Sequence, residues 1–449
     1  MKTDISGYVA VNRDRLLNEL KDLCRIPSVG DDPRALKEAA EMVTLRFREL
    51  GARVGLFELG EGPPLVYAEL GAGPKTLLVY NHYDVQPPDP RGEWRADPFL
   101  PEIRDGRLWC RGSSDNKGNL MARIHALRAC LETGAGLPLR LKFLVEGEEE
   151  TGSAHLARCV REHADLFSAD GCLWELSWKE TSGRHILSCG VKGMCYVELR
   201  AKGADHDLHS SHASIVPNPA WRLVWALSTL LGTDYRMTLD GWAMEKRDLT
   251  GTEENAFRVV PFDEEGFKKI HGVPEFIRRL SGGDLVHEFL SAPTCTICGL
   301  RAGYTGKGSK TVLPSEAVAK LDFRLVPNMT PEKLLRALRR HLDERDFTDI
   351  DIQYLGGYMP ATTDCGDSIV TAARAALREV SGEEPILYPV APWSGPLHDV
   401  CGTLDIPSVA FGIGNEDSRD HAPNENIKLD DYFEGIRVMD SFMRIYSTI

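Results

Sequence analysis

Five short segments carry histidine and carboxylate side chains, the groups that bind zinc and similar divalent cations in proteins. They are LLVYNHYDVQPP with His82 and Asp84, RGSSDNKGNL with Asp115, LVEGEEETGS with four glutamates, GCLWELSW with Glu175, and SRDHAPNENI with His421. Together they supply enough ligands for two cations that share a bridging carboxylate. A further carboxylate would remain free to move protons, so the set fits metal-assisted hydrolysis by activated water.

The first segment ends an apolar run and has the order His-x-Asp. His82 and Asp84 are two residues apart, so both side chains point the same way if the chain there is extended. A carboxylate that accepts a hydrogen bond from the far ring nitrogen fixes the histidine tautomer and makes it a stronger ligand. Taken alone, the same histidine could simply end a strand and cap a turn.

Two other segments also have ordinary explanations. Asp115 stands just before a helical pattern, where an N-cap role is typical. The third segment could be a solvated acidic loop formed by Glu146, Glu148, Glu149 and Glu150. However, clustered carboxylates repel one another unless a cation neutralises them, and these follow directly on an apolar strand pattern. The five segments together therefore indicate a metal site more strongly than any one does alone.

Composition excludes several other classes of function. Lys and Arg total 53 and Asp and Glu total 67 among 449 residues, and the net charge of -14 argues against a nucleic-acid-binding face. The first twenty residues lack a signal-peptide pattern, and no window approaches the roughly 20 apolar residues of a membrane span. The 11 cysteines have no framework spacing, and the Cys295–Cys298 pair has no second pair at zinc-finger spacing. We therefore expect a cytoplasmic protein with idle, reduced thiols and no nucleic-acid or membrane partner.

The elements that must position these segments alternate between strand and helix patterns in the first part of the chain. Such alternation predicts an α/β catalytic domain whose mixed sheet is covered by helices on both faces. In such sheets, sites form at the carboxyl ends of strands. Helical periodicity covers 16–23, 35–50, 118–131 and 153–162, and strand patterns cover 54–59, 65–70, 76–80, 139–145 and 171–176.

The pattern changes near Gly190, and a chain of this length normally needs more than one core. A smaller α+β unit follows, with strands at 194–201, 318–325 and 349–354 and helices at 219–231 and 331–343. The α/β character returns with a helix at 368–380, a strand at 408–412 and a final helix at 430–446. We therefore predict a catalytic domain formed by residues 1–190 and 359–449, with an α+β unit of residues 191–358 inserted into it.

In this order, the five segments resemble the cocatalytic dinuclear-zinc peptidases. That family includes carnosinase-type dipeptidases, aminoacylase, carboxypeptidase G and succinyl-diaminopimelate desuccinylase. HYDVQP, GSSDNKG and EGEEETGS are specific as a set, and the resemblance covers nearly the whole chain, closest to the carnosinase-like branch. It implies two divalent cations, with zinc expected and manganese or cobalt as substitutes.

The resemblance also implies a role for each matching residue. His82 and Glu175 would bind one cation, Glu150 and His421 would bind the other, and Asp115 would bridge the two. In the family, the peptide bond after the bridging aspartate is cis.

Two further residues of the same segments match residues of the family that bind no metal. Glu149 would be the general base, and Asp84 would orient the ring of His82.

The inserted unit resembles the lid of the family, through which two copies form a homodimer. His209 in GADHDLHSSHAS matches a histidine that reaches the neighbouring protomer's site and stabilises the oxyanion, with His206 and His212 as competitors. Arg324 in KLDFRLVPNM matches an arginine that binds the substrate's terminal carboxylate, a bidentate task that suits a guanidinium.

Two departures bear on the substrate. Glu175 stands where dipeptidases of the family commonly have Asp and deacylase-like members have Glu. The stretch PWSGPLHDV replaces a Gly-Gly-Ser-Ile-Pro-like turn, although Ser394 and Gly395 could still donate hydrogen bonds to a carboxylate. His398 in the same stretch is either a substrate contact or a satisfied polar residue.

The sequence therefore predicts a two-metal hydrolase that cleaves dipeptides or dipeptide-like amides with a free terminal carboxylate. The alternative within enzymes is an N-acyl- or N-carbamoyl-amino-acid amidohydrolase, which would use the same groups on another acyl part. A catalytically silent metal-binding protein is a more distant alternative, because both the expected base, Glu149, and the bridging Asp115 are present.

Overall fold

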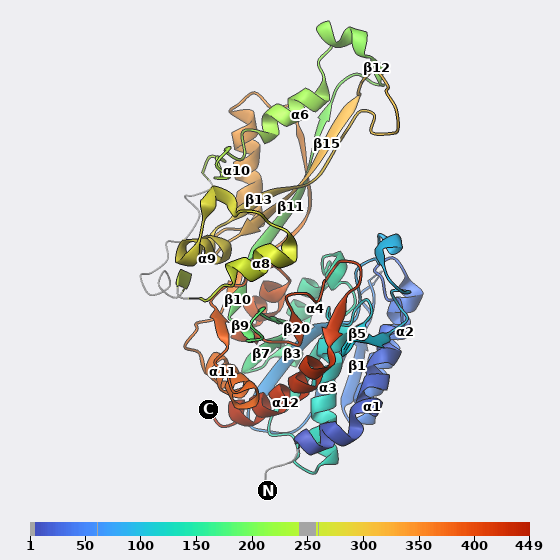
Figure 1. The fold of residues 1–449 in the computed structure, drawn as a ribbon, viewed down its shortest axis with the longest axis vertical. Coiled ribbons are helices and arrows are strands. Elements are labelled where there is room, and N and C mark those ends of the chain that lie inside the picture. Colours follow the sequence, from blue (N-terminus) through green and yellow to red (C-terminus); the bar gives the residue numbers. More distant parts are fainter. Residues whose placement is uncertain (1–4, 61, 242–256, 259) are drawn as a thin grey trace.

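The computed structural model describes residues 5–60, 62–241, 257–258 and 260–449, which form a broad unit and a narrower unit that projects from it (Figure 1). The broad unit is built on an eight-stranded mixed sheet with the strand order β1-β2-β6-β3-β7-β19-β9-β18. The strands in this order are β1 (Arg53–Phe57), β2 (Leu65–Leu70), β6 (Arg140–Glu146), β3 (Thr76–His82), β7 (Gly171–Trp174), β19 (Ser408–Ala410), β9 (Ile186–Ser188) and β18 (Ile386–Tyr388).

The central strands of this sheet run parallel. β3 pairs in parallel with both β6 and β7, and β7 pairs in parallel with β19. At one edge, β1 and β2 are antiparallel to each other and β2 is antiparallel to β6. The mixed sheet predicted from the sequence is thus confirmed, and four neighbouring parallel strands direct their carboxyl ends to the same edge.

Alternate residues of the central strands enter two different cores, so both faces of the sheet are covered. Leu77 and Val79 of β3 pack in the core that includes residues of α1 (Ile5–Cys24), α2 (Pro33–Glu49), α3 (Lys117–Glu132), α11 (Ser368–Ser381) and α12 (Leu429–Tyr446). Leu78 and Tyr80 pack on the opposite face with residues of α4 (Leu156–Glu162) and the π-helix η5 (His398–Gly402). A strand buried on both faces reads as a continuous apolar run, which is the pattern of TLLVY.

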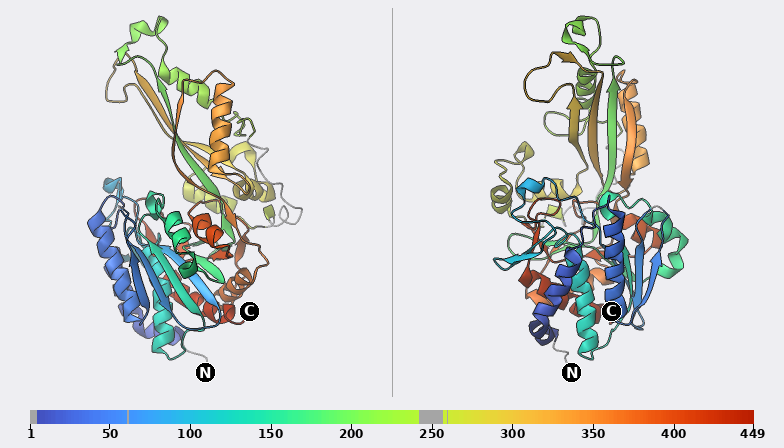
Figure 2. Two further views of the ribbon diagram at one scale, coloured as in Figure 1. Left: turned by 180° about the vertical axis from the view of Figure 1, so that it is seen from behind. Right: turned by 90° about the vertical axis from the view of Figure 1, so that its right-hand side faces the viewer.

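The narrower unit, which we call the second unit, contains a four-stranded antiparallel sheet between Gly193 and Tyr358. Its strand order is β13-β15-β11-β16. The strands are β13 (Thr294–Ala302), β15 (Glu316–Leu325), β11 (Gly193–Lys202) and β16 (Asp351–Tyr358), and the helices α6 (Pro219–Leu227) and α10 (Pro331–Asp343) pack on one face (Figure 2). The chain leaves and re-enters the broad unit at two paired strands, β10 (Gly190–Val191) and β17 (Ala361–Thr362).

Several elements differ from the sequence-based prediction. The helix predicted from residue 153 begins at Leu156, because Gly152 and Ser153, which follow the 3-10 turn η2 (Glu149–Thr151), have positive φ angles that an α-helix does not allow. The strand β13 and the helices α8 (Glu264–His271) and α9 (Gly282–Ser291) were not predicted. β13 is an edge strand with mostly exposed or half-exposed residues, so its sequence lacks a clear apolar alternation. β13 carries the Cys295–Cys298 pair, whose thiols are free.

Among the described helices, none is both long and apolar enough to cross a membrane.

A largely buried ionic cluster links α12 to the strand β8 (Trp178–Lys179) and to His185 within the broad unit. Lys179, in β8, has its Nζ 2.7 Å from Glu434 Oε1 and 2.7 Å from Asp431 Oδ1, and His185 Nε2 lies 2.6 Å from the same Glu434 oxygen. Burial raises the pKa of Glu434, but hydrogen bonds from His185 and Lys179 outweigh it and lower that pKa to about 2. The cluster therefore favours the ionised carboxylate in the folded protein.

Replacing Glu434→Gln should destabilise the fold at neutral pH and do so less in acid. Because the folded-state pKa of Glu434 is depressed, its contribution to the free energy of unfolding is complete above the unfolded value near 4.5. That contribution is lost as the pH falls toward 2. We expect the free energy of unfolding of Glu434→Gln to be lower than that of wild type by on the order of 2 kcal/mol at pH 7, and by less at pH 3.5. Urea unfolding of metal-free protein measures this difference. Glu379→Gln, on a half-exposed glutamate, is the control. If Glu434→Gln lowered the free energy of unfolding equally at the two pH values, the Glu434 charge would contribute nothing to stability.

Candidate metal centre

The centre is assembled at the carboxyl ends of the parallel strands. His82 is the last residue of β3 and lies in register with Glu146, the last residue of β6. Glu175 directly follows β7, on the other side of β3. Parallel neighbours end at the same edge of a sheet, so residues that are far apart in sequence meet there.

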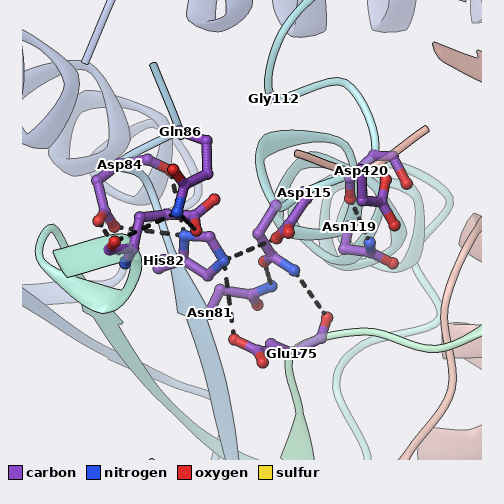
Figure 3. A network of polar contacts seen from close by, with 12 residues as sticks. Asn81, His82, Asp84, Gln86, Gly112, Asp115, Asn119, Glu175 and Asp420 are labelled. Carbon is purple, nitrogen blue, oxygen red and sulfur yellow. Dashed lines mark hydrogen bonds and ion pairs between the residues drawn. The ribbon is translucent and has the colours of Figure 1, made fainter. Parts of the chain in front are cut away.

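Two histidines face the two oxygens of one aspartate. His82 Nε2 lies 3.0 Å from Asp115 Oδ1, and His421 Nε2 lies 3.0 Å from Asp115 Oδ2. Glu175 Oε2 is 3.7 Å from His82 Nε2, and Glu150 Oε2 is 3.2 Å from His421 Nε2 (Figure 3 shows the His82 side of this arrangement). Each half of the centre therefore has one histidine and one glutamate, and the Asp115 carboxylate lies between the halves. His82, Asp115 and Glu150 have ligand atoms close enough together to hold a metal ion.

Asp115 does not cap the helix that follows it. The N-cap position of α3 is Asn116, whose side chain makes no capping hydrogen bond, and the peptide bond between Asp115 and Asn116 is cis. Asn116 Nδ2 instead donates to the carbonyl oxygen of Glu175 at 3.2 Å. The ordinary N-cap explanation of Asp115 is therefore excluded by the structure.

The four glutamates of the acidic segment have different partners. Glu146 accepts hydrogen bonds from the Tyr80 hydroxyl and, at 3.1 Å, from Ser153 Oγ. Glu148 accepts from the backbone N–H of His155 at 2.6 Å and lies 2.9 Å from the ring Nδ1 of the same residue. Two of the four are thus held by the surrounding protein, which leaves Glu149 and Glu150 facing the centre.

Glu149 lies beside the ligand group without a hydrogen-bond partner among the described residues. A Cβ built on Gly395 would lie 3.6 Å from Glu149 Oε1 and 3.5 Å from Glu175 Oε1, so these two carboxylates face the same glycine. Burial first, and the Glu175 carboxylate next, raise the pKa of Glu149 well above its ordinary value. A larger residue at position 395 would crowd the space in front of both carboxylates.

Asp84 and Gln86 hold ligands in position. Asp84 Oδ1 lies 3.3 Å from His82 Nδ1, while Asp84 Oδ2 accepts a 2.9 Å hydrogen bond from the backbone N–H of Glu150. Gln86 Nε2 donates to Glu150 Oε2 at 2.9 Å. One aspartate therefore connects the ligands of the two halves, and such contacts fix the orientation of metal-binding side chains.

The donor set fits divalent cations. Glu150 Oε1 and Glu175 Oε2 are buried carboxylate oxygens with no hydrogen-bond donor among the described residues. Burial, together with the Asp115 and Glu150 carboxylates, raises the pKa of Glu175 to about 7 although His82 opposes the shift. Burial lowers the pKa of His421, but Asp115 and Glu150 outweigh it and raise that pKa to about 11. The protein alone thus binds extra protons here, and cations that neutralise the same charge would release them.

Two buried residues that the sequence analysis did not single out support the centre. Arg123 of α3 donates to the carbonyl oxygens of Tyr80 at 2.9 Å, Trp174 at 2.5 Å and Phe411 at 3.4 Å, and so joins the ends of β3, β7 and β19. Glu425 accepts hydrogen bonds from the Arg111 guanidinium at 2.7 Å and from the backbone N–H groups of Gly112, Ser114 and Asp115 at 3.0, 2.9 and 3.0 Å. Its place in HAPNE, four residues after His421, was the only signal in the sequence.

His209, Arg324, His398 and Ser394 make their own contacts outside this group. His209 is in β12 (Leu208–His209) at the far end of the second unit, where its ring contacts Ser211 and Thr311 (Figure 1). Arg324 donates to Asp322 at 2.8 Å. His398 lines a cavity with residues 360–364, 367, 401–402 and 405–408. Ser394 donates to the carbonyl oxygen of Gly193 at 2.9 Å and precedes Gly395, the glycine that faces Glu149 and Glu175.

A mixed α/β sheet that gathers two histidines and four carboxylates at its strand ends defines a metal-dependent enzyme. The sequence profile of Peptidase family M20/M25/M40 matches residues 78–445, and the chain belongs to this family. It is 29% identical to the Beta-Ala-His dipeptidase of Rattus norvegicus, over 97% of this chain and 93% of that protein. It is 28% identical to the Cys-Gly metallodipeptidase of Schizosaccharomyces pombe, over 97% and 96%. The solved M20 family metallo-carboxypeptidase of Sulfolobus solfataricus is 37% identical, with a TM-score of 0.92 over 97% and 99% of the two chains.

Replacing Glu425→Gln should weaken metal binding. The substitution removes the charge that holds Arg111 and replaces one acceptor oxygen by an amide donor, which faces the backbone N–H groups that position Asp115. We expect the affinity for a divalent cation to fall about 10- to 100-fold, measured by titrating metal-free protein with zinc. Glu416→Gln, the same change on a half-exposed residue of the same loop, is the control. Equal zinc affinity in Glu425→Gln and wild type would contradict the positioning role.

Proposed function

We propose that the protein hydrolyses the amide bond of dipeptides or dipeptide-like substrates that carry a free terminal carboxylate. The observation that carries the proposal is the buried group of His82, Asp115 and Glu150, with Glu149 beside it and without a described partner. Two relatives matched over 97% of the chain are named dipeptidases, which supports the same class of substrate.

In this proposal His82 and Glu175 hold one divalent cation, Glu150 and His421 hold another, and Asp115 bridges them. Zinc suits this mixture of imidazole and carboxylate ligands, and manganese or cobalt can replace it. When bound, the cations lower the pKa of water and polarise the carbonyl group of the substrate.

The side chains of the protein carry out the proton transfers and bind the substrate. Glu149 takes a proton from the attacking water and delivers it to the leaving amine. Arg324 exchanges its contact with Asp322 for the terminal carboxylate of the substrate, with Ser394 and Gly395 as further contacts. For His398, which lines a cavity next to β17, the choice between a substrate contact and a satisfied polar residue stays open.

We further propose a homodimer in which His209 enters the partner's site and stabilises the oxyanion there. Within one chain, His209 lies far from the ligand group (Figure 1). The outer face of α6 in the second unit exposes three apolar residues, Trp221, Val224 and Trp225, which are 58%, 41% and 54% exposed. An exposed patch with two tryptophans is typical of a protein–protein interface.

An N-acyl- or N-carbamoyl-amino-acid amidohydrolase is the second candidate, and the residue that favours it is Glu175 at a position where dipeptidases of the family commonly have Asp. The reaction would use the same cations and the same base. The relative named a metallo-carboxypeptidase also makes longer peptides worth testing, because such an enzyme removes a terminal residue from them.

The Glu149→Gln variant tests the proposed reaction. Loaded with zinc, wild-type protein should release amino acids from dipeptides faster than from N-acetyl or N-carbamoyl amino acids or longer peptides. Glu149→Gln should retain both cations, because Glu149 is not a ligand, and lose about 10²- to 10⁴-fold in kcat. Glu150→Gln, which removes a ligand, should lose metal as well as activity. Activity near wild type in Glu149→Gln would rule out the assignment of the base, and hydrolysis confined to N-acyl substrates would favour the second candidate.

Mixing two inactive variants tests the shared site. A heterodimer of His209→Ala and Glu149→Gln has one site with an intact Glu149 and a His209 from the partner. If subunits exchange freely, half of the dimers are mixed and each has one complete site, so we expect about a quarter of wild-type activity to return. His212→Ala mixed with Glu149→Gln is the matched control. No recovery despite exchange of subunits would contradict the contribution of His209 across the interface.

A further inference from the structure

A cavity of about 580 Å³ lies between the broad unit and the helices α8 and α9. In Figure 1 these helices lie at the junction of the two units. Six aromatic side chains form much of the cavity wall, three from the broad unit and three from the segment that contains α8 and α9: Trp178, Tyr388, Trp393, Phe262, Phe267 and Phe289. The volume is within the range of about 300–1,000 Å³ that is usual for small-molecule sites.

The cavity adjoins the metal centre at Asp420, which lines the cavity and precedes His421. Figure 3 shows Asp420 on the side of Asp115 that is opposite His82. An occupant of the cavity would therefore lie next to the ligand group.

Two wall residues belong to segments that also contribute to the centre. Trp178 follows Glu175 by three residues, and Trp393 precedes Gly395, which faces Glu149 and Glu175, by two residues. The two indole rings pack edge to face with centroids 4.2 Å apart. The cavity and the reacting groups thus share the same short loops, and a substrate held at the centre has an aromatic wall within reach.

Most polar groups of the cavity are already engaged by the protein, so the aromatic wall is the main surface left for an occupant. Asp420 accepts a 2.7 Å hydrogen bond from Trp178 Nε1, Glu416 lies 3.4 Å from His271, and Asp417 pairs with the Arg107 guanidinium at 2.9 Å. Each of these three carboxylates has a partner on one oxygen, while Asp420 Oδ1 is buried without a hydrogen-bond partner among the described residues. Arg419 also lines the cavity and has no ion-pair partner among the described residues, so a basic side chain would meet a cation.

We propose that this cavity is the subsite for an aromatic side chain of the substrate. The inference rests on the proposed dipeptide hydrolysis and adds the class of side chain that the enzyme prefers. Aromatic rings pack well edge to face or offset against Trp and Phe, and burial of a ring stabilises a complex through the apolar area removed from water. The preferred dipeptides are thus those with Phe, Tyr or Trp at the position that reaches the cavity.

The first part of the test compares Phe-Ala, Ala-Phe and Ala-Ala on zinc-loaded wild-type protein. One of the two phenylalanine dipeptides should be hydrolysed with a kcat/KM about ten- to a hundredfold above that of Ala-Ala. Hydrolysis of Ala-Ala with no preference for either phenylalanine dipeptide would overturn the subsite while leaving the proposed function in place. Failure to hydrolyse any dipeptide would overturn both.

The second part fills the cavity without touching the centre. Ile270 of α8 lines this cavity and is 45% exposed, so Ile270→Trp places a large side chain in it. Ile277 lines a neighbouring apolar cavity of about 450 Å³ and is 43% exposed, so Ile277→Trp is a matched control. Ile270→Trp should abolish the preference for the phenylalanine dipeptide and leave kcat/KM for Ala-Ala within about twofold of wild type, whereas Ile277→Trp should change neither.

Binding without turnover provides an independent readout. Each substitution is combined with Glu149→Gln, and calorimetry measures binding of the preferred phenylalanine dipeptide. Ile270→Trp should bind it more weakly than Ile277→Trp does. The ratio of the two affinities should equal the factor by which Ile270→Trp lowers kcat/KM. An equal affinity in the two double variants, or an Ile270→Trp enzyme that keeps its preference, would overturn the assignment of the cavity.

Discussion

The structure is organised around negative charge that is buried where four parallel strands end. Asp84, Asp115, Glu149, Glu150 and Glu175 lie close together, and among the described residues two histidines, His82 and His421, oppose their charge. Buried carboxylates at such separations cannot all ionise unless cations neutralise them. This requirement explains why oxygens of Glu150 and Glu175 lack donors and why the pKa of Glu175 rises to about 7. The repulsion between these buried carboxylates favours binding of cations, because the two histidines cannot neutralise all of them as salt bridges.

The surrounding fold holds this charged group in place with buried hydrogen bonds. Arg123 fixes the ends of three strands through their carbonyl oxygens, and Glu425 fixes the turn that presents Asp115 through successive backbone N–H groups. Both residues are buried, so each bond forms in a low-dielectric environment where an unmade bond is costly. Because Glu425 is only four residues from His421, one short loop both supplies a ligand and positions the aspartate between the two halves. The candidate metal ligands are therefore held in place by the protein although they come from five separate segments.

The proposed substrate-binding groups are arranged differently from the candidate metal ligands. His82 and Glu175 lie at strand ends of one sheet, and Asp115, Glu150 and His421 lie in turns and loops beside them. The aromatic cavity instead lies where that unit meets α8 and α9, and His209 and Arg324 belong to the second unit. The main cores of the two units are separate clusters, and a smaller cluster joins β9 and β18 to α9. Such a division allows one chemistry to be combined with different substrate preferences.

The sequence by itself determined the ligand types, the position of His82 and Glu175 at strand ends, and the mixed α/β class, because these follow from local apolar periodicity and from side-chain chemistry. It left Asp115 open between an N-cap and a ligand, and only the tertiary structure excluded the cap. The separation of Glu146 and Glu148 from Glu149 and Glu150 depended on Tyr80, Ser153 and His155, and the role of Glu425 depended on Arg111, more than 300 residues earlier. The edge strand β13 and the cavity wall were likewise decided by packing. Contacts between distant segments leave no periodic trace in the sequence, so the residue pattern without the family resemblance could not tell which carboxylates stay free.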